Sequence, residues 1–165
     1  MNDDISDMLR EEKEREEIMD SIDRTLEIIN DLPPNNPRIG VHFTSLIPLY
    51  LQINLDENAR TVLEFAIKHG DGIAALAMYA GQMEERCIRK KTFLGNDFEE
   101  AMSGYTRLME LDPTQGNFLL GELFERKGNK KKAIVYYERT VNAKGYSAYI
   151  NLAERKLNEL RAEFE

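Results

Sequence analysis

The sequence predicts an all-α protein in which antiparallel helical hairpins stack into a solenoid behind an N-terminal helical arm. Two observations predict this fold class. Three segments share one spacing of alanine and bulky apolar residues, and apolar residues elsewhere recur at helical rather than alternating spacing. Signals for strands are poor, because few runs alternate and Asp71-Gly72 is the only dipeptide typical of a tight hairpin. We therefore expect helices along the body of the chain.

Residues 1–32 are predicted to form an acidic helical arm, and residues 33–38, PPNNPR, a linker. The composition of 3–31 favours helix, and Pro33-Pro34 ends it because a residue before proline is disfavoured in the α conformation. Residues 10–17, REEKEREE, have no apolar face, whereas the next three turns carry the apolar stripe Ile18, Met19, Ile22, Leu26 and Ile29. Either 18–32 caps the solenoid while 1–17 is solvated or disordered, or the arm is a coiled-coil or docking helix for a second chain.

The repeat is defined by three segments of the domain predicted at 39–165, which are DENARTVLEFAIKHGD (56–71), DFEEAMSGYTRLMELDP (97–113) and NKKKAIVYYERTVNAKG (129–145). Aligned on Ala59, Ala101 and Ala133, they place a bulky residue four positions later, namely Leu63, Tyr105 and Tyr137. Alanine lets a neighbouring helix approach closely, and the larger residue fills the adjacent groove. The alanines are 42 and 32 residues apart, so the repeat is imperfect.

Each repeated helix has a predicted partner helix before it. The clearest is GNFLLGELFERKG (116–128), with Gly121 where two backbones are expected to meet and Gly128 suited to a left-handed helix stop. YSAYINLAERKL (146–157) repeats this pattern with alanine in the place of Gly121, and 72–91 is a longer version. An earlier partner is expected at 43–54, where Pro48 fits either the first turn or a kink.

Segment 114–145 resembles a tetratricopeptide repeat, whose usual length is about 34 residues. The matching positions are Leu120, Gly121, Phe124, Gly128, Ala133 and Tyr137, and ELDP at 110–113 is similar to the usual repeat junction. The longer repeat at 72–113 is more similar to the Sel-one-like relatives. Asn117 and Thr140 depart from the family pattern, which usually has an aromatic residue and an alanine there. The resemblance implies a right-handed α-solenoid whose first helices line a concave binding surface.

Charge and composition disfavour several classes of function. The net charge is −8; residues 1–17, with eight acids and three bases, contribute −5, and residues 18–165 contribute −3. This disfavours attraction to nucleic acid or to an anionic membrane. No stretch approaches the ~18 apolar residues of a membrane span, and the start lacks the order of a secretion signal. The single cysteine can form no disulfide within the chain, which fits a reducing compartment, so we expect a cytoplasmic protein.

No constellation of residues indicates catalysis, a metal or a cofactor. His42 and His69 lack metal-ligand spacing, and His69 is expected to have a structural or capping role at a helix end. Cys87 lies among Arg86, Arg89 and Lys90, which would lower the pKa of its thiol, but a lone cysteine without a paired base is most often incidental. A glycine loop that would cradle phosphate is also missing. We expect a protein that is not an enzyme.

Two basic clusters precede the second helices of successive repeats. The first is Arg86, Arg89, Lys90 and Lys91, and the second is Arg126, Lys127, Lys130, Lys131 and Lys132. Equivalent positions of stacked hairpins line up along one edge, so the clusters are predicted to form a basic ridge. They are either solvated turns with cations near helix ends, or a docking ridge for an acidic segment, including the chain's own arm.

The resemblance places the binding surface on 114–127, at Gln115, Phe118, Glu122, Glu125 and Arg126. Phe118 is either an apolar anchor for a ligand or an ordinary helix-packing residue. Glu122 and Glu125 favour a helical or partly basic ligand over the carboxylate that the family often clamps. The predicted function is a non-enzymatic adaptor that binds a peptide or helix of another protein. The alternative is a structural homo-oligomer assembled through the repeats and the arm.

Overall fold

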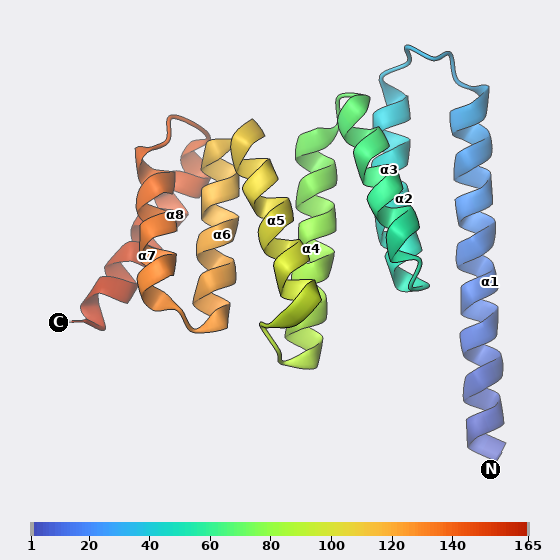
Figure 1. Ribbon diagram of the computed structural model, residues 1–165, viewed down its shortest axis with the longest axis horizontal. Coiled ribbons are helices and arrows are strands. Elements are labelled where there is room, and N and C mark those ends of the chain that lie inside the picture. Colours follow the sequence, from blue (N-terminus) through green and yellow to red (C-terminus); the bar gives the residue numbers. More distant parts are fainter. Residues whose placement is uncertain (1, 165) are drawn as a thin grey trace. The chain divides into compact units, whose positions relative to one another are not determined.

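The computed structural model describes residues 2–164, and all regular structure among them is α-helical, which confirms the predicted class (Figure 1). Consecutive helices are joined by short turns. Their bounds are α1 Asn2–Asp31, α2 Arg38–Gln52, α3 Asp56–Lys68, α4 Gly72–Lys90, α5 Gly95–Leu111, α6 Pro113–Lys127, α7 Lys130–Asn142 and α8 Ser147–Ala162.

The chain forms two compact units, one ending at Ala75 and the next beginning at Leu76, so that α4 crosses the boundary in its first turns. The predicted organisation instead separated an arm, a linker and a repeat domain at 32 and 38. The arm helix α1 belongs to the same compact unit as α2 and α3 because it packs against α2. Each unit is described below on its own.

In the first unit, α2 and α3 form an antiparallel hairpin. Phe43 of α2 stacks on Phe65 of α3, with ring centroids 5.1 Å apart. Thr44 donates a hydrogen bond to Asp71 at 2.5 Å, which ties α2 to the turn after α3. Because α2 begins at Arg38 and not at the predicted residue 43, Pro48 lies in the helix interior, and the first-turn interpretation is wrong.

Helix α1 is about twice as long as the helix on which it packs. At ~1.5 Å per residue, its 30 residues span about 45 Å, whereas the 15 residues of α2 span about 22 Å. Ile22 is 2% exposed, and Arg15 donates a hydrogen bond to the carbonyl of Ile53 at the end of α2 (3.0 Å). The C-terminal half of α1 therefore packs on α2, and its N-terminal half extends past the end of α2 (Figure 1).

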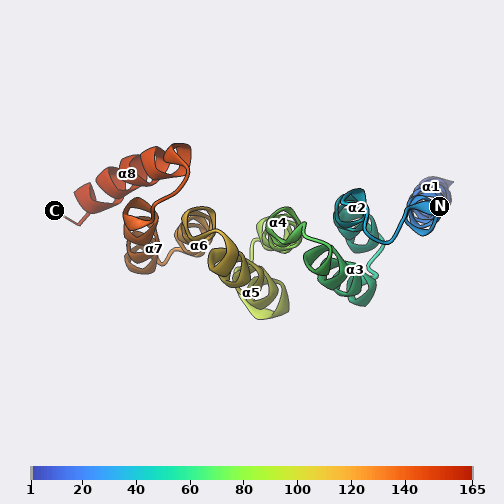
Figure 2. The ribbon, with the colours of Figure 1, turned by 90° about the horizontal axis from the view of Figure 1, so that it is seen from above.

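The second unit contains two similar hairpins, α4–α5 and α6–α7, followed by α8. Seen from above, α4 and α6 lie on one side and α5 and α7 on the other (Figure 2). The repeat alanines Ala101 and Ala133 are 0% exposed, as is Ala59 in the first unit, because all three lie in the helix contacts for which a small side chain was predicted. A Cβ on Gly104 would lie 2.8 Å from the Cβ of Ala80, so the helices of the first hairpin approach very closely.

The bounds of α6 follow from local sequence signals. Asp112 accepts a hydrogen bond from the backbone N–H of Gln115 at 3.1 Å, and Pro113 occupies the first turn, where its missing N–H has no consequence. Gly128 ends the helix in the left-handed conformation, with φ of 87°. The segment predicted as a repeat junction thus sets the start of α6 and so fixes which of its residues face α4 and α8.

Candidate functional site

Four of the five predicted binding residues on α6 lie on its α4- and α8-facing side. Arg126 contacts Glu84 of α4, Glu125 contacts Lys156 of α8, and Phe118 packs on α8. Glu122 lies within electrostatic reach of Glu84 and Lys156. Gln115 is half-buried one turn before Phe118. The five residues chosen from the resemblance therefore lie along one continuous face of α6.

Phe118 is a core residue and does not line an open groove. Its ring lies 5.4 Å from that of Tyr149 in α8 and 5.8 Å from that of Tyr137 in α7, and the residue is only 5% exposed. The interpretation of Phe118 as a ligand anchor is therefore replaced by the helix-packing alternative. The physical reason is that α8 covers the ring, and this contact is invisible in the sequence of α6 alone.

A hydrogen bond from tyrosine to glutamate recurs at equivalent places in the two hairpins. Tyr105 donates a hydrogen bond to Glu84 at 2.7 Å, and Tyr137 donates one to Glu125 at 2.8 Å. Each glutamate lies four residues after the small residue of its helix, Ala80 in α4 and Gly121 in α6. Burial raises the pKa of both tyrosines, and the adjacent carboxylate raises it further. These pairs hold first and second helices together.

Each of these glutamates also has a cation beside it. The guanidinium of Arg126 lies 3.1 Å from Glu84, and the ammonium of Lys156 lies 3.4 Å from Glu125. Glu84 is 6% exposed, and a charge at that depth requires such a partner. Sequence reasoning missed Glu84 and Lys156. The available signal for Glu84 was its spacing of four from Ala80, which matches the spacing of Glu125 from Gly121.

Glu122 differs from the two paired glutamates. It is half-buried, yet within residues 2–164 no side chain or backbone group donates a hydrogen bond to its carboxylate or forms an ion pair with it. Burial is the main cause that raises its pKa; Arg126 and Lys156 act in the lowering direction, and Glu84 and Glu125 in the raising direction. Glu122 is thus a partly desolvated carboxylate with acceptor oxygens available to a cationic donor.

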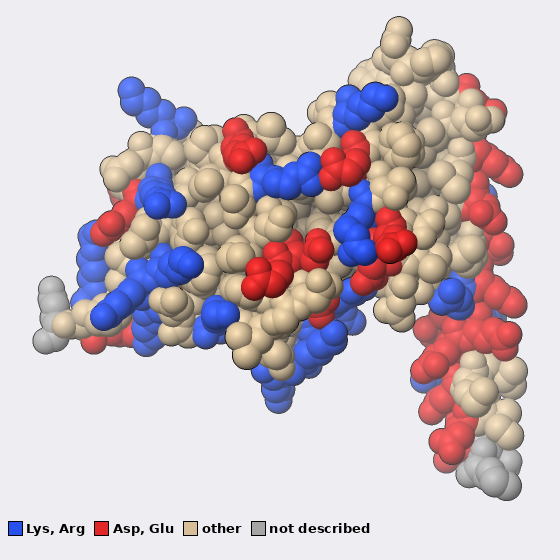
Figure 3. All heavy atoms as spheres, viewed as in Figure 1, with Lys and Arg blue, Asp and Glu red and all other residues tan. Residues whose placement is uncertain are grey.

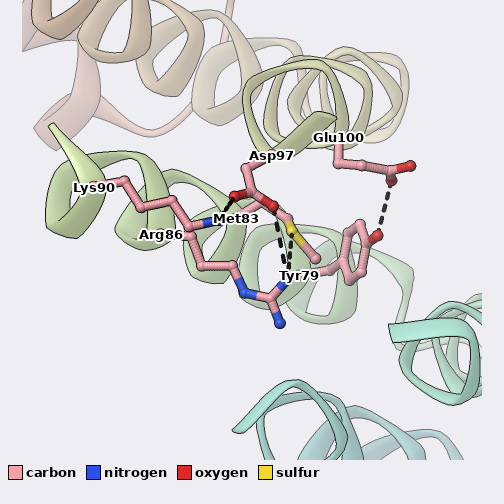
Figure 4. A network of polar contacts seen from close by, with 6 residues as sticks. All are labelled: Tyr79, Met83, Arg86, Lys90, Asp97 and Glu100. Carbon is pink, nitrogen blue, oxygen red and sulfur yellow. Dashed lines mark hydrogen bonds and ion pairs between the residues drawn. The ribbon is translucent and has the colours of Figure 1, made fainter. Parts of the chain in front are cut away.

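Two cations of the predicted basic ridge are engaged inside the second unit. In Figure 4, Arg86 and Lys90 of α4 converge on Asp97 of α5, at 3.7 Å and 2.7 Å. The side chain of Arg86 is only 12% exposed and also lies 3.9 Å from the sulfur of Met83. A further bond, from Tyr79 to Glu100 (2.8 Å), joins the same two helices. Arg86 and Lys90 therefore help to hold α4 to α5.

The second basic cluster is similarly engaged. Lys127 donates to the carbonyl of Phe93 at 3.0 Å and lies 3.9 Å above the ring of Phe98, which joins the end of α6 to the start of the preceding α5. Lys130 pairs with Glu163. Lys132 lies 4.5 Å from the ring centroid of Phe124, and the remaining ridge residues Arg89, Lys91 and Lys131 are exposed.

Lys and Arg do gather along one edge of the second unit (Figure 3), while Asp and Glu follow α1. The cations of the basic ridge, however, make contacts within the second unit. These contacts favour a role in stabilising turns and helix ends over a role as a docking ridge.

Cys87 and His69 are packed against neighbouring side chains. Cys87 is 0% exposed, and burial raises the pKa of its thiol, with Asp97 and Glu84 adding to the rise and Lys90 opposing it. The net shift of this pKa is therefore upward, opposite to the expected one, although Lys90 acts in the lowering direction. His69 follows the last residue of α3 and stacks on Phe43, with ring centroids 5.7 Å apart.

Over residues 2–164, no cluster of three or more His, Cys, Asp and Glu side chains is arranged to hold a metal ion. None of the helices there combines the length and apolar character needed to cross a membrane. No family model, curated protein or solved structure matches this chain, so its function must be inferred from its own geometry.

Proposed function

We propose that the chain is a non-enzymatic interaction module that holds a peptide or helix of another protein on the α6 face of its second unit. In this proposal the hairpins are tetratricopeptide-like repeats of a right-handed solenoid, and the α6 face lies on its concave side. The ligand presents a lysine or arginine to Glu122. The buried single cysteine suits a reducing compartment, and we place the protein in the cytoplasm.

The state of Glu122 carries this proposal. A carboxylate that is removed from water without gaining hydrogen bonds is unfavourable for the fold. Glu84 and Glu125 each accept a hydrogen bond from a tyrosine and form an ion pair, whereas within residues 2–164 Glu122 does neither and feels Arg126 and Lys156 only as electrostatic neighbours. An ammonium or guanidinium group from a ligand would supply the donors and the opposite charge at once. The Glu122 carboxylate would therefore stabilise the complex with such a ligand, although it does not stabilise the fold of the chain alone.

Gln115 extends the same binding surface along α6. It lies seven residues before Glu122, which is two helical turns and about 10 Å along the axis. Its amide offers both donors and an acceptor, which suits the backbone of a bound segment. Phe118 lies between Gln115 and Glu122 but is buried. In this proposal the ligand therefore contacts Gln115 and Glu122 and not Phe118.

The test compares Glu122→Gln with Glu99→Gln, which makes the same charge change at an exposed position of α5. The immobilised wild type and both variants are exposed to lysate of the source cells, and retained proteins are identified by mass spectrometry. We expect a partner that is held by the wild type and Glu99→Gln and lost by Glu122→Gln, with no fall in melting temperature. If Glu122→Gln retains every protein that the wild type retains, the site is refuted.

A second candidate function is a structural homo-oligomer built through the repeats and α1. The observation behind it is that apolar side chains are exposed on the N-terminal half of α1, where Ile5 and Met8 are 56% and 68% exposed. The net charge of −5 on residues 1–17 opposes the pairing of two copies of α1. Light scattering at tens of micromolar tests it. A mass equal to the 19.1 kDa of one chain would exclude this candidate.

A further inference from the structure

The first unit has a hollow where α1 extends past the end of α2. It has a volume of about 670 Å³ and is bounded by Met8, Glu11, Glu12 and Ile18 of α1 and by Ile53 after α2. Ile53 is 4% exposed and lies at the base of this corner. We refer to this hollow, together with the adjoining face of α1, as the α1–α2 corner.

An apolar stripe leads along α1 to the corner. Ile5, Met8 and Leu9 lie at i, i+3 and i+4, which places them on one side of the helix. They are 56%, 68% and 61% exposed, so the fold of the unit does not use them. Single exposed apolar residues are common, but three grouped on one helix face beside a hollow are typical of an interaction surface.

The charge around this stripe indicates which kind of partner fits. Residues 1–17 carry a net charge of −5. Two of their three cations already have acceptors, because Arg10 pairs with Asp7 at 3.2 Å and Arg15 donates to the carbonyl of Ile53. Glu11 and Glu12 remain exposed at the rim of the hollow. A second copy of α1 would bring the same negative charge and be repelled, whereas a basic segment would be attracted.

We propose that the α1–α2 corner binds an amphipathic helix of a partner protein whose apolar residues are flanked by lysine and arginine. The apolar side of that helix packs against Ile5, Met8 and Leu9 and enters the hollow towards Ile18. Its cations face Glu11 and Glu12 at the rim. The extended part of α1 offers about 20 Å at ~1.5 Å per residue, enough for a helix of about four turns. This surface is separate from Glu122 and does not depend on the function proposed above.

The test uses three synthetic peptides of about five helical turns. The first has leucines on one face and lysines elsewhere, the second has the same composition in scrambled order, and the third replaces its lysines with glutamates. Binding to the full chain is measured by calorimetry at low and high salt. We expect the amphipathic basic peptide to bind at least about tenfold more tightly than either control peptide, and to weaken with salt.

Two triple variants locate the binding surface. Ile5→Ser/Met8→Ser/Leu9→Ser removes the stripe, and Val41→Ser/Leu94→Ser/Leu111→Ser removes three apolar residues of similar exposure, at 56%, 68% and 52%. The first variant should lose the tenfold preference and the second should keep it. Circular dichroism checks that both variants remain helical.

Four results would overturn the proposal. Equal binding of the scrambled peptide would show attraction by charge alone, and equal binding of the glutamate peptide would remove the charge argument. Unchanged binding by the stripe variant would place the site elsewhere. A wild-type dimer that the stripe variant converts to a monomer would identify a second copy as the occupant and contradict a basic partner.

Discussion

The Gly121→Ala substitution tests whether the small position of α6 is required by the ring of Tyr137. A Cβ at Gly121 would lie 2.6 Å from both Cδ1 and Cε1 of Tyr137 and 3.0 Å from its Cζ. Tyr137 is 0% exposed, its ring packs on Phe118, and its hydroxyl donates to Glu125. The ring therefore cannot move aside without disturbing the core on one side or the hydrogen bond on the other.

The expected loss of stability follows from three contributions. Overpacking a filled core costs about 1–3 kcal/mol, and weakening a hydrogen bond to a charged acceptor costs part of its ~1.5–3 kcal/mol. Replacing glycine by alanine inside a helix offsets about 1 kcal/mol of this. We therefore expect Gly121→Ala to lower the free energy of unfolding by about 1–3 kcal/mol.

Gly81→Ala in α4 is the matched control. A Cβ there would meet only the hydroxyl oxygen of Tyr105, at 3.8 Å, which is an ordinary contact. This variant should gain the helix-propensity contribution alone, so that its free energy of unfolding rises by about 0.5–1 kcal/mol. Urea unfolding followed by far-ultraviolet circular dichroism measures both. If the two variants are equally stable, or if Gly121→Ala exceeds the wild type, the packing account of the repeat is refuted.

Three further predictions follow from buried ionisable groups. Glu122→Gln should be more stable than the wild type near neutral pH, because folding raises the pKa of Glu122 and so disfavours its charged form. Below the ordinary pKa of 4.5 the wild-type side chain is protonated and carries no such cost. The cost appears as pH rises through the pKa of the folded state. Thermal melts across that range should show the difference between the two proteins vanish in acid; a constant difference would contradict the assignment. Cys87 should not react with a thiol reagent until urea unfolds the chain, since it is 0% exposed and burial raises its pKa; prompt labelling of the native protein would show that its surroundings open. Tyr105 and Tyr137 should stay protonated above the ordinary tyrosine pKa of 10.0, so absorbance titration of the folded chain should show fewer ionised tyrosines than titration in denaturant; coincident curves would argue against their burial.

Most helix bounds could be predicted because they depend on local signals. The glycine at 128 and the prolines at 33–34 end α6 and α1 close to where the sequence indicated. The predicted helix at 43–54 starts five residues later than α2, which begins at Arg38, the last residue of the predicted linker. Pro37 precedes the first helical residue, a position where proline is tolerated, and this signal would have placed the start correctly.

The candidate site was harder to predict because it depends on partners from other helices. Periodicity placed Phe118 on the right face of α6, but only the position of Tyr149 in α8 shows that the ring is covered. Arg86 and Lys90 gave a basic cluster in sequence, while their pairing with Asp97 depends on how α5 folds back on α4. Hydrophobic spacing carries no information on which charged side chains meet across a turn.

The recurring tyrosine–glutamate hydrogen bond distinguishes glutamates that hold helices together from a glutamate that is available to a ligand. A glutamate four residues after the small position of its helix reaches the tyrosine four residues after the repeat alanine, and this holds for Glu84 with Tyr105 and for Glu125 with Tyr137. Glu122 immediately follows the small position and has no such tyrosine within reach of a hydrogen bond in the described chain. Glu84 and Glu125 are therefore tied to tyrosines, whereas the half-buried carboxylate of Glu122 remains available to a ligand. Glu122 is the acid at which binding and stability should respond in opposite directions.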